Sequence, residues 1–124
     1  MNVVGSSGWL EYFADGKNAE VFAPPIQDIK NLIVSTINIY EVFKKILEQK
    51  DENGALEAIA AMEQARVINL NSTLAVSAAG LSYELKLPMA DSMILATARL
   101  HSATVWTQDA HFKHLPGVKY FPKR

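Results

Sequence analysis

Apolar residues occur along the chain in two kinds of stretch. Short runs rich in β-branched residues are typical of buried strands, whereas longer stretches with an apolar residue every three or four positions predict helices. The short runs predict strands at 2–4, 32–35, 67–70 and 103–107, with a marginal fifth at 118–121. The longer stretches predict a first helix that closes at Asp15-Gly16, and further helices at 18–22, 37–50, 51–65, 73–86 and 91–101. This alternation predicts an α/β fold whose mostly parallel sheet, of four to five strands, carries helices on both faces.

Polar residues with short side chains stand where several of these helices should begin. Ser6 or Ser7 can cap the first helix, and Thr36 or Asn38 can cap the helix that follows the second strand. In both places the cap follows a strand directly, so the chain is expected to turn sharply from strand into helix.

Two further helices carry more specific expectations. The helical piece at 18–22 should stop before Pro24-Pro25, because an interior proline removes a backbone hydrogen bond. The helix at 73–86 should bury its apolar residues to varying degrees, namely Leu74, Val76, Ala79, Leu81, Tyr83 and Leu85.

The composition limits the chemistry that such a fold could carry. A chain of 124 residues is expected to form a single domain, residues 1–124, and to bury roughly two thirds of its unfolded surface. Cysteine is absent, which excludes disulfides, thiol nucleophiles and thiolate metal sites. Any metal ion must therefore bind to oxygen or to imidazole nitrogen.

The charge and the hydropathy pattern set further limits. Lys and Arg number 12 against 13 Asp and Glu, so the net charge of -1 provides no general basic field for nucleic acid. The end of the chain is locally basic and could be either a nucleic-acid patch or a solvated tail, with Lys113, His114, Lys119, Lys123 and Arg124. The start has no basic leader and no stretch has 18 uninterrupted apolar residues, so a cytoplasmic protein without a membrane segment is expected.

Neither the histidines nor the glycines match a familiar binding motif. His101, His111 and His114 lack the i, i+4 spacing with a carboxylate that a zinc-binding helix has, and each is interpreted as a surface or helix-end residue. The Gly-Ser-Ser-Gly turn after the first strand is too short for a dinucleotide fingerprint or a phosphate-binding loop.

Three carboxylates interrupt the pattern at places where a sheet could bring them together. Glu41 follows the second strand, Asp91 opens a late helix, and Asp109 follows the fourth strand. Each also has an ordinary structural explanation. Glu41 could form an exposed pair with Lys45 worth about 0.2–0.5 kcal/mol, Asp91 could complement a helix dipole, and Asp109 could be an N-cap.

Considered together, the three acids predict a metal site at one edge of a parallel sheet, outside the carboxyl ends of its strands. Carboxylates about 6 Å apart repel one another by roughly 3 kcal/mol per pair at an effective dielectric constant of 20, so such a cluster implies a bound cation. An all-oxygen set favours Mg²⁺ or Mn²⁺. These ions polarise phosphoryl oxygens and activate water, which is the chemistry of nucleases and phosphatases.

Four segments also resemble a known family. NVVGSSGWLEYF, STINIYEVFKKIL, LPMADSMILATARL and TVWTQDAHF are similar to the four signature blocks of PIN domains, in particular the VapC-type toxins of toxin–antitoxin pairs. The resemblance covers nearly the whole chain. It implies a three-layer, flavodoxin-like fold and a Mg²⁺-dependent (or Mn²⁺-dependent) endoribonuclease that acts on RNA, forms a homodimer and is held inactive by a cognate antitoxin protein.

The resemblance also assigns roles to individual residues. Glu41, Asp91 and Asp109 match three family acids, which hold the metal and carry the catalysis. Ser7 matches the polar position two residues after the first acid, and Thr107 matches the Thr of the closing TxD, both as residues that support the metal ligands. From spacing alone, Ser7 and Thr107 could equally be helix caps.

One position departs from the family pattern. The first family block ends its strand in Asp, whereas this chain has Gly5. The missing acid is the central metal ligand of the family, so the resemblance predicts a weakened or empty metal site. Its loss also removes up to three like-charge repulsions and could make the metal-free fold more stable. Gly5 is explained either by inactivation of a toxic protein or by a lineage that has kept the fold for binding only.

Three functions follow as hypotheses. The first is a toxin with a ribonuclease scaffold that Gly5 impairs, and the second is an inactive PIN-like module that binds an antitoxin, and through it DNA. In the second case an amphipathic partner helix could bind in an apolar groove on the surface. Unless they are buried in the core, the side chains that form this groove are Trp9, Tyr12, Phe13, Ile46 and Leu47. A DNA nuclease or phosphatase is a third, because carboxylate spacing does not distinguish substrates.

Overall fold

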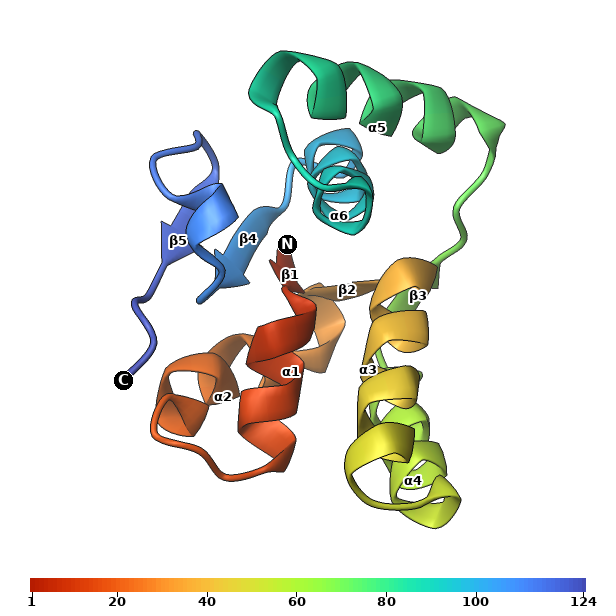
Figure 1. Ribbon diagram of the computed structural model, residues 1–124, viewed down its shortest axis with the longest axis vertical. Coiled ribbons are helices and arrows are strands. Elements are labelled where there is room, and N and C mark those ends of the chain that lie inside the picture. The colour runs from red at the N-terminus through yellow and green to blue at the C-terminus, as the bar shows by residue number, and fades with distance from the viewer.

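Five parallel strands form one sheet in the computed structural model, which describes residues 1–124 (Figure 1). The spatial order is β3-β2-β1-β4-β5, and each neighbouring pair is parallel. The strands are β1 (Asn2–Val4), β2 (Leu32–Ser35), β3 (Arg66–Ile68), β4 (Thr104–Thr107) and β5 (Val118–Tyr120). The predicted α/β class and parallel sheet are confirmed, and the marginal fifth strand is a true edge strand.

Six α-helices and two short 3-10 helices connect the strands. The α-helices are α1 (Ser6–Phe13), α2 (Ala19–Gln27), α3 (Thr36–Gln49), α4 (Glu52–Met62), α5 (Ser72–Leu85) and α6 (Met89–Leu100). The 3-10 helices are η1 (Ile29–Asn31), before β2, and η2 (Ala110–Phe112), after β4. None of the helices is long and apolar enough to cross a membrane.

Helices cover both faces of the sheet, which gives the predicted three-layer arrangement. One face packs against α6 through buried side chains that include Val3, Ile94 and Val105. α5 lies on the far side of α6 from the sheet (Figure 1). The other face packs against the first four helices, through a second cluster that includes Val4 and Trp9. The burial of apolar side chains on both faces explains why the central strands contain few polar residues.

The helix at the two prolines is longer than its sequence predicts. α2 runs through Pro24 and Pro25 to Gln27, although neither proline can donate a helical hydrogen bond. Phe22 and Ile26 lie one turn apart and are both buried in the core. Continuing the helix keeps these two side chains on the same face, and their burial outweighs the lost hydrogen bonds.

The caps of α1 and α3 differ from the prediction, and the structure also identifies the cap of α5. α1 has Gly5 as its N-cap with no side-chain hydrogen bond, so neither Ser6 nor Ser7 caps it. Ser35 caps α3: its Oγ accepts from the backbone of Ile37, and Asn38 accepts from Ser35 N in return. α5 is capped by Asn71, whose side chain accepts from Leu74 N.

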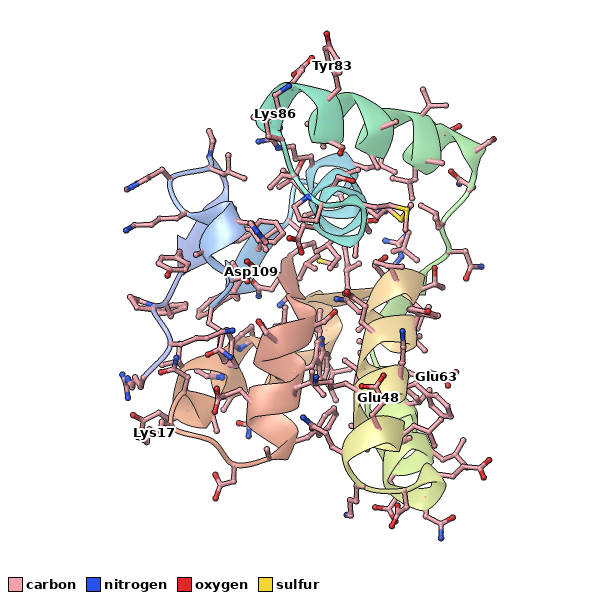
Figure 2. All side chains as sticks on the ribbon, viewed as in Figure 1. Lys17, Glu48, Glu63, Tyr83, Lys86 and Asp109 are labelled. Carbon is pink, nitrogen blue, oxygen red and sulfur yellow. The ribbon has the colours of Figure 1, made fainter.

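α5 buries less of its surface than expected. Leu74 and Ala78 face α6 and are buried, whereas Val76 and Tyr83 are 74% and 79% exposed. The helix is amphipathic only weakly, and its outer side carries apolar residues into solvent. Figure 2 shows Tyr83 pointing away from the molecule at the end of α5.

The topology brings the ends of three strands to one place. β1 lies between β2 and β4, and the strand order reverses there, because the chain moves outward from β1 to β3 before it returns to β4. Ligands of open α/β sheets bind at such a switch point, outside the carboxyl ends of the strands. In this chain Gly5, Ser35 and Thr107 mark these ends.

Candidate functional site

α6 brings Asp91 to the carboxyl edge of the sheet. The helix ends at Leu100 and β4 begins at Thr104, so the chain reverses direction within a few residues. The start of α6 therefore lies level with the end of β4, because a helix of this length spans about 18 Å. Asp91 is in the first turn of α6, where the partial positive charge of the helix end favours a carboxylate.

Asp109 lies just beyond the end of β4, in the middle of the molecule (Figure 2). Its Oδ1 accepts a hydrogen bond of 2.9 Å from His111 N, so it caps η2 as the N-cap explanation predicted. Its own backbone N donates to Thr107 Oγ1 at 3.0 Å. Thr107 is buried and thereby fixes the backbone that carries the Asp109 carboxylate.

Glu41 is held by α1 and does not form the exposed pair with lysine. Ser6 Oγ donates to Glu41 Oε1 at 2.7 Å, and Asn38 Nδ2 donates to Ser6 Oγ at 2.9 Å. Asn38 is fully buried. This chain of hydrogen bonds connects the first turns of α1 and α3 and turns Glu41 toward the carboxyl ends of the strands.

A shallow pocket of about 240 Å³ contains the acids identified from the sequence. Glu41, Asp91 and Asp109 line it, together with Ser7 and Lys45. Ser7 is hydrogen-bonded through its backbone carbonyl, which accepts from Gln108 Nε2, whereas Lys45 brings a basic residue to the pocket wall. The larger pocket, of about 300 Å³, lies away from these acids, between α1, α3 and α4.

Gly5 forms part of the same pocket wall at the end of β1. Its backbone N donates to Trp106 O at 2.9 Å, which pairs the turn into α1 with β4. A Cβ at this position would lie 3.0 Å from Thr107 Oγ1 and 3.4 Å from Thr107 Cβ. Any other residue would therefore require a displacement of a few tenths of an ångström here.

His111 lies between the two aspartates. Its Nδ1 is 3.0 Å from Asp91 Oδ2 and 3.0 Å from Asp109 Oδ1. The side chain is 57% exposed, as expected for a surface residue, but its ring faces the acids as well as solvent. His111 was expected at the surface and not at this site; its position two residues after Asp109, in a tight 3-10 turn, is the signal that could have connected it to the acids.

The environment of Asp91 makes its carboxyl group a weaker acid. Burial, and next the negative charge of Asp109, raise the pKa of Asp91 from 3.8 to about 6. His111 acts in the opposite direction, through its charge and its hydrogen bond, and Glu41 raises the pKa slightly further. Bringing carboxylates together without a cation thus disfavours the ionised form of Asp91.

These donors fit a divalent cation. One atom each from Asp91, Asp109 and His111 lie within 4.8 Å of one another, while Glu41 stands in the same pocket but outside this group. Oxygen and imidazole ligands are those that the absence of cysteine leaves to the chain. The structure thus brings Asp91 and Asp109 together and places Glu41, Ser7 and Thr107 around them. Gly5 offers no side-chain ligand to a metal ion.

Comparisons with known proteins agree with the fold. The PIN domain family model matches residues 3–118. A toxin–antitoxin complex from Klebsiella pneumoniae contains a chain that superposes with a TM-score of 0.84 at 22% identity, covering 99% of this chain and 100% of that one. The toxin VapC20 from Mycobacterium tuberculosis, a sarcin-ricin loop cleaving toxin, gives 0.79 at 16% identity, covering 98% and 100%.

A third match comes from a complex with DNA. DNA-bound VapBC from Salmonella typhimurium contains a chain that gives a TM-score of 0.73 at 14% identity, with 98% of both chains covered. No curated protein sequence matches this chain. At such low identities the solved structures establish a shared fold and nothing finer.

Proposed function

The chain belongs to the PIN domain family, and from this membership we propose that it is the toxin of a toxin–antitoxin pair with the scaffold of a metal-dependent endoribonuclease. The observation that carries the proposal is the meeting of Asp91 and Asp109, with Glu41, in one pocket at the switch point of the parallel sheet. The VapC20 toxin that shares this fold cleaves the sarcin-ricin loop, which supports RNA as the substrate class. Such a substrate implies a cytoplasmic protein.

We assign the divalent ion to Asp91 and Asp109, with Glu41 as the third acid of the pocket; Mg²⁺ or Mn²⁺ is the ion of the family pattern. When bound, such an ion polarises a phosphoryl oxygen and makes water a stronger nucleophile. Thr107 fixes the backbone of Asp109, and Ser6 fixes one oxygen of Glu41. Lys45 is positioned to attract the phosphate of the substrate through its charge.

Gly5 is expected to impair this activity. The pocket wall at the end of β1 offers no side-chain donor, and Thr107 lies close to the place that a Cβ would take. A carboxylate at position 5 would add a charge beside Asp91 and Asp109 and strengthen cation binding. The site in this chain therefore has the shape of a nuclease pocket but one acid fewer than the family pattern.

A paired cleavage experiment tests this proposal. The chain and its Gly5→Asp variant are incubated with a panel of structured RNAs in Mg²⁺ or Mn²⁺, with Gly5→Asn as the uncharged control of equal size. We expect cleavage only by Gly5→Asp. Robust cleavage by the unmodified chain would overturn the impairment, and absence of both cleavage and cation binding in every variant would overturn the nuclease.

An antitoxin is the proposed protein partner, and the apolar pocket between α1, α3 and α4 is its proposed binding site. Leu10, Phe13, Ile46 and Ala58 line this pocket, so the sequence-based groove is retained in part. Trp9, by contrast, is buried in the core. The related folds from toxin–antitoxin complexes support a partner that covers such a surface.

A catalytically inactive module that binds an antitoxin is the second candidate, and Gly5 is the observation that favours it. Pull-down from the native host separates a toxin–antitoxin role from a protein without a partner. The assigned pocket would be supported if a stable small partner is lost from the Phe13→Glu and Ile46→Glu variants but still binds Leu56→Glu. Leu56 lies on the exposed side of α4 and serves as the control. Absence of any partner would count against the toxin–antitoxin role.

A further inference from the structure

The acidic pocket contains one nitrogen donor among its oxygen donors. His111 Nδ1 lies 3.0 Å from an oxygen of Asp91 and 3.0 Å from an oxygen of Asp109. Adjacent ligands of an octahedral ion with metal–ligand bonds of 2.0–2.1 Å are separated by about 3 Å. The spacing of the imidazole from both carboxylates is therefore that of neighbouring ligands around one ion.

The backbone holds His111 in this position. His111 N donates to the same carboxylate, Asp109 Oδ1, at 2.9 Å, and the next residue, Phe112, is buried in the core beneath the site. The turn of η2 therefore presents the imidazole to Asp91 although much of the ring is exposed to solvent. The contact does not depend on a long flexible side chain.

The other acids of the pocket cannot replace this nitrogen without rearrangement. Gly5 has no side chain, and Glu41 Oε1 is engaged by Ser6 and lies outside the group formed by Asp91, Asp109 and His111. Two carboxylates and one neutral imidazole carry a charge of about −2, which a divalent ion neutralises.

We propose that His111 supplies the third ligand that Gly5 has lost, so that Asp91, Asp109 and His111 form a mixed oxygen and nitrogen site for a divalent transition-metal ion. Imidazole favours ions such as Zn²⁺ and Co²⁺, whereas Mg²⁺ prefers oxygen ligands throughout. The site of this chain thus differs in metal selectivity from an all-carboxylate site. This inference rests on the metal site of the proposed function and deepens it.

Binding measurements without RNA test the inference. Titration calorimetry with Zn²⁺, Co²⁺ or Mg²⁺ alone is carried out on the unmodified chain, on His111→Gln and on His114→Asn. His114 is exposed and outside the site, and its backbone φ of 71° suits Asn, so this variant controls for adventitious binding by a surface imidazole. We expect Zn²⁺ affinity to fall at least about tenfold in His111→Gln and to stay unchanged in His114→Asn.

A spectroscopic measurement on the unmodified chain avoids any dependence on the variants. Long-range ¹H–¹⁵N NMR of the histidine rings reports which nitrogen a metal occupies, and Zn²⁺ should perturb Nδ1 of His111 and leave its Nε2 protonated. Zn²⁺ binding that is insensitive to His111→Gln, or that leaves His111 Nδ1 unperturbed, would overturn the inference.

The Gly5→Asp variant separates this inference from the proposed function. If Gly5→Asp binds Mg²⁺ while Zn²⁺ binding never involves His111, the inference fails and the carboxylate site of the proposed function stands. If no ion binds to any variant, both fail. If Zn²⁺ binds through His111 and Gly5→Asp gains Mg²⁺ affinity, both are supported.

Discussion

Gly5 adopts a backbone conformation open to every residue type, with φ of -63° and ψ of 157°. Its presence is therefore not required by the turn from β1 into α1. What distinguishes the position is its surroundings: Thr107 Oγ1 stands 3.0 Å from the place of a Cβ, and the carboxylates lie in the same pocket. Replacing Gly5 thus tests sterics and charge separately.

We predict that charge is the larger of the two effects in the absence of cations. With a chelator present, Gly5→Ala and Gly5→Asn should change the free energy of unfolding by about 1 kcal/mol or less. Crowding against Thr107 destabilises the folded chain, whereas the loss of glycine lowers the conformational entropy of the unfolded chain, and the two effects partly cancel. Gly5→Asp should be less stable than Gly5→Asn by about 1–3 kcal/mol through repulsion from the other acids. Urea unfolding measures these differences, and equal stabilities of the Asp and Asn variants would contradict the prediction.

Asp91 makes the stability of the metal-free protein depend on pH. Its pKa is raised from 3.8 to about 6 by burial and by Asp109, so between these values the folded chain keeps a proton that the unfolded chain releases. The stability contributed by this group is complete below pH 4 and is lost as pH rises through 6. The loss amounts to at most about 3 kcal/mol.

We therefore predict that Asp91→Asn stabilises the protein at pH 7 and not at pH 4. Urea unfolding with a chelator across pH 4–7 should show the unmodified chain losing stability relative to Asp91→Asn as pH rises. The comparison between the two proteins cancels the titration of the groups that do not interact with Asp91. A constant difference across this range would show that the environment of Asp91 does not shift its pKa.

Among the secondary structure elements, α1 and α3 are joined at their first turns by one buried amide. Asn38 is fully buried, accepts from Ser35 N at 3.3 Å and donates to Ser6 Oγ at 2.9 Å. Through Ser6 it also sets the direction of Glu41. The amide thus contributes both to the start of α3 and to the form of the pocket.

We predict that Asn38→Ala lowers the free energy of unfolding by about 1–3 kcal/mol, because it leaves buried groups without partners. Asn31→Ala is the matched control: Asn31 is exposed and bonds only to Asp28 three residues earlier, so its loss should cost about 0.5 kcal/mol or less. Chemical denaturation of both variants gives the comparison. Equal losses would mean that the buried chain of hydrogen bonds adds nothing to stability.

Elements whose signal is local could be predicted from the sequence. β1 and β2 have the predicted bounds, 2–4 and 32–35, because a short β-branched run between turn residues has few alternatives. α2 could not be predicted in full, since its passage through Pro24 depends on the burial of Phe22 and Ile26 in a core made by distant segments. Val76 is likewise exposed because α5 meets only one neighbour closely.

The same distinction applies to the candidate site. Asp109 could be predicted as a residue at the edge of the sheet because its position follows from the end of β4. The partners of the acids could not, because they depend on which turns meet: Ser6 faces Glu41 across helices that are 35 residues apart in sequence. The contact of His111 with Asp91, across 20 residues, arises only when η2 and α6 come together.

At the scale of the whole molecule, α5 and α6 leave several large apolar side chains exposed. Val76 and Tyr83 lie two turns apart on α5 and are mostly exposed, and Met89 and Leu100 on α6 are 67% and 60% exposed. α5 is also the outermost helix of its layer (Figure 1). A second copy of the chain would cover such residues, in agreement with the homodimer that the family resemblance implies.

We predict that the chain forms a homodimer and that this surface mediates it. A stable interface buries about 800 Å² on each partner and is anchored by central apolar and aromatic residues. The double variant Val76→Arg and Tyr83→Arg should therefore shift the chain from dimer to monomer at micromolar concentration in size-exclusion chromatography with light scattering. Leu56→Arg, on the exposed side of α4, should leave the dimer intact. Because all three side chains are exposed, these changes act on association and not on folding, so a dimer that survives the double variant would place the interface on another face.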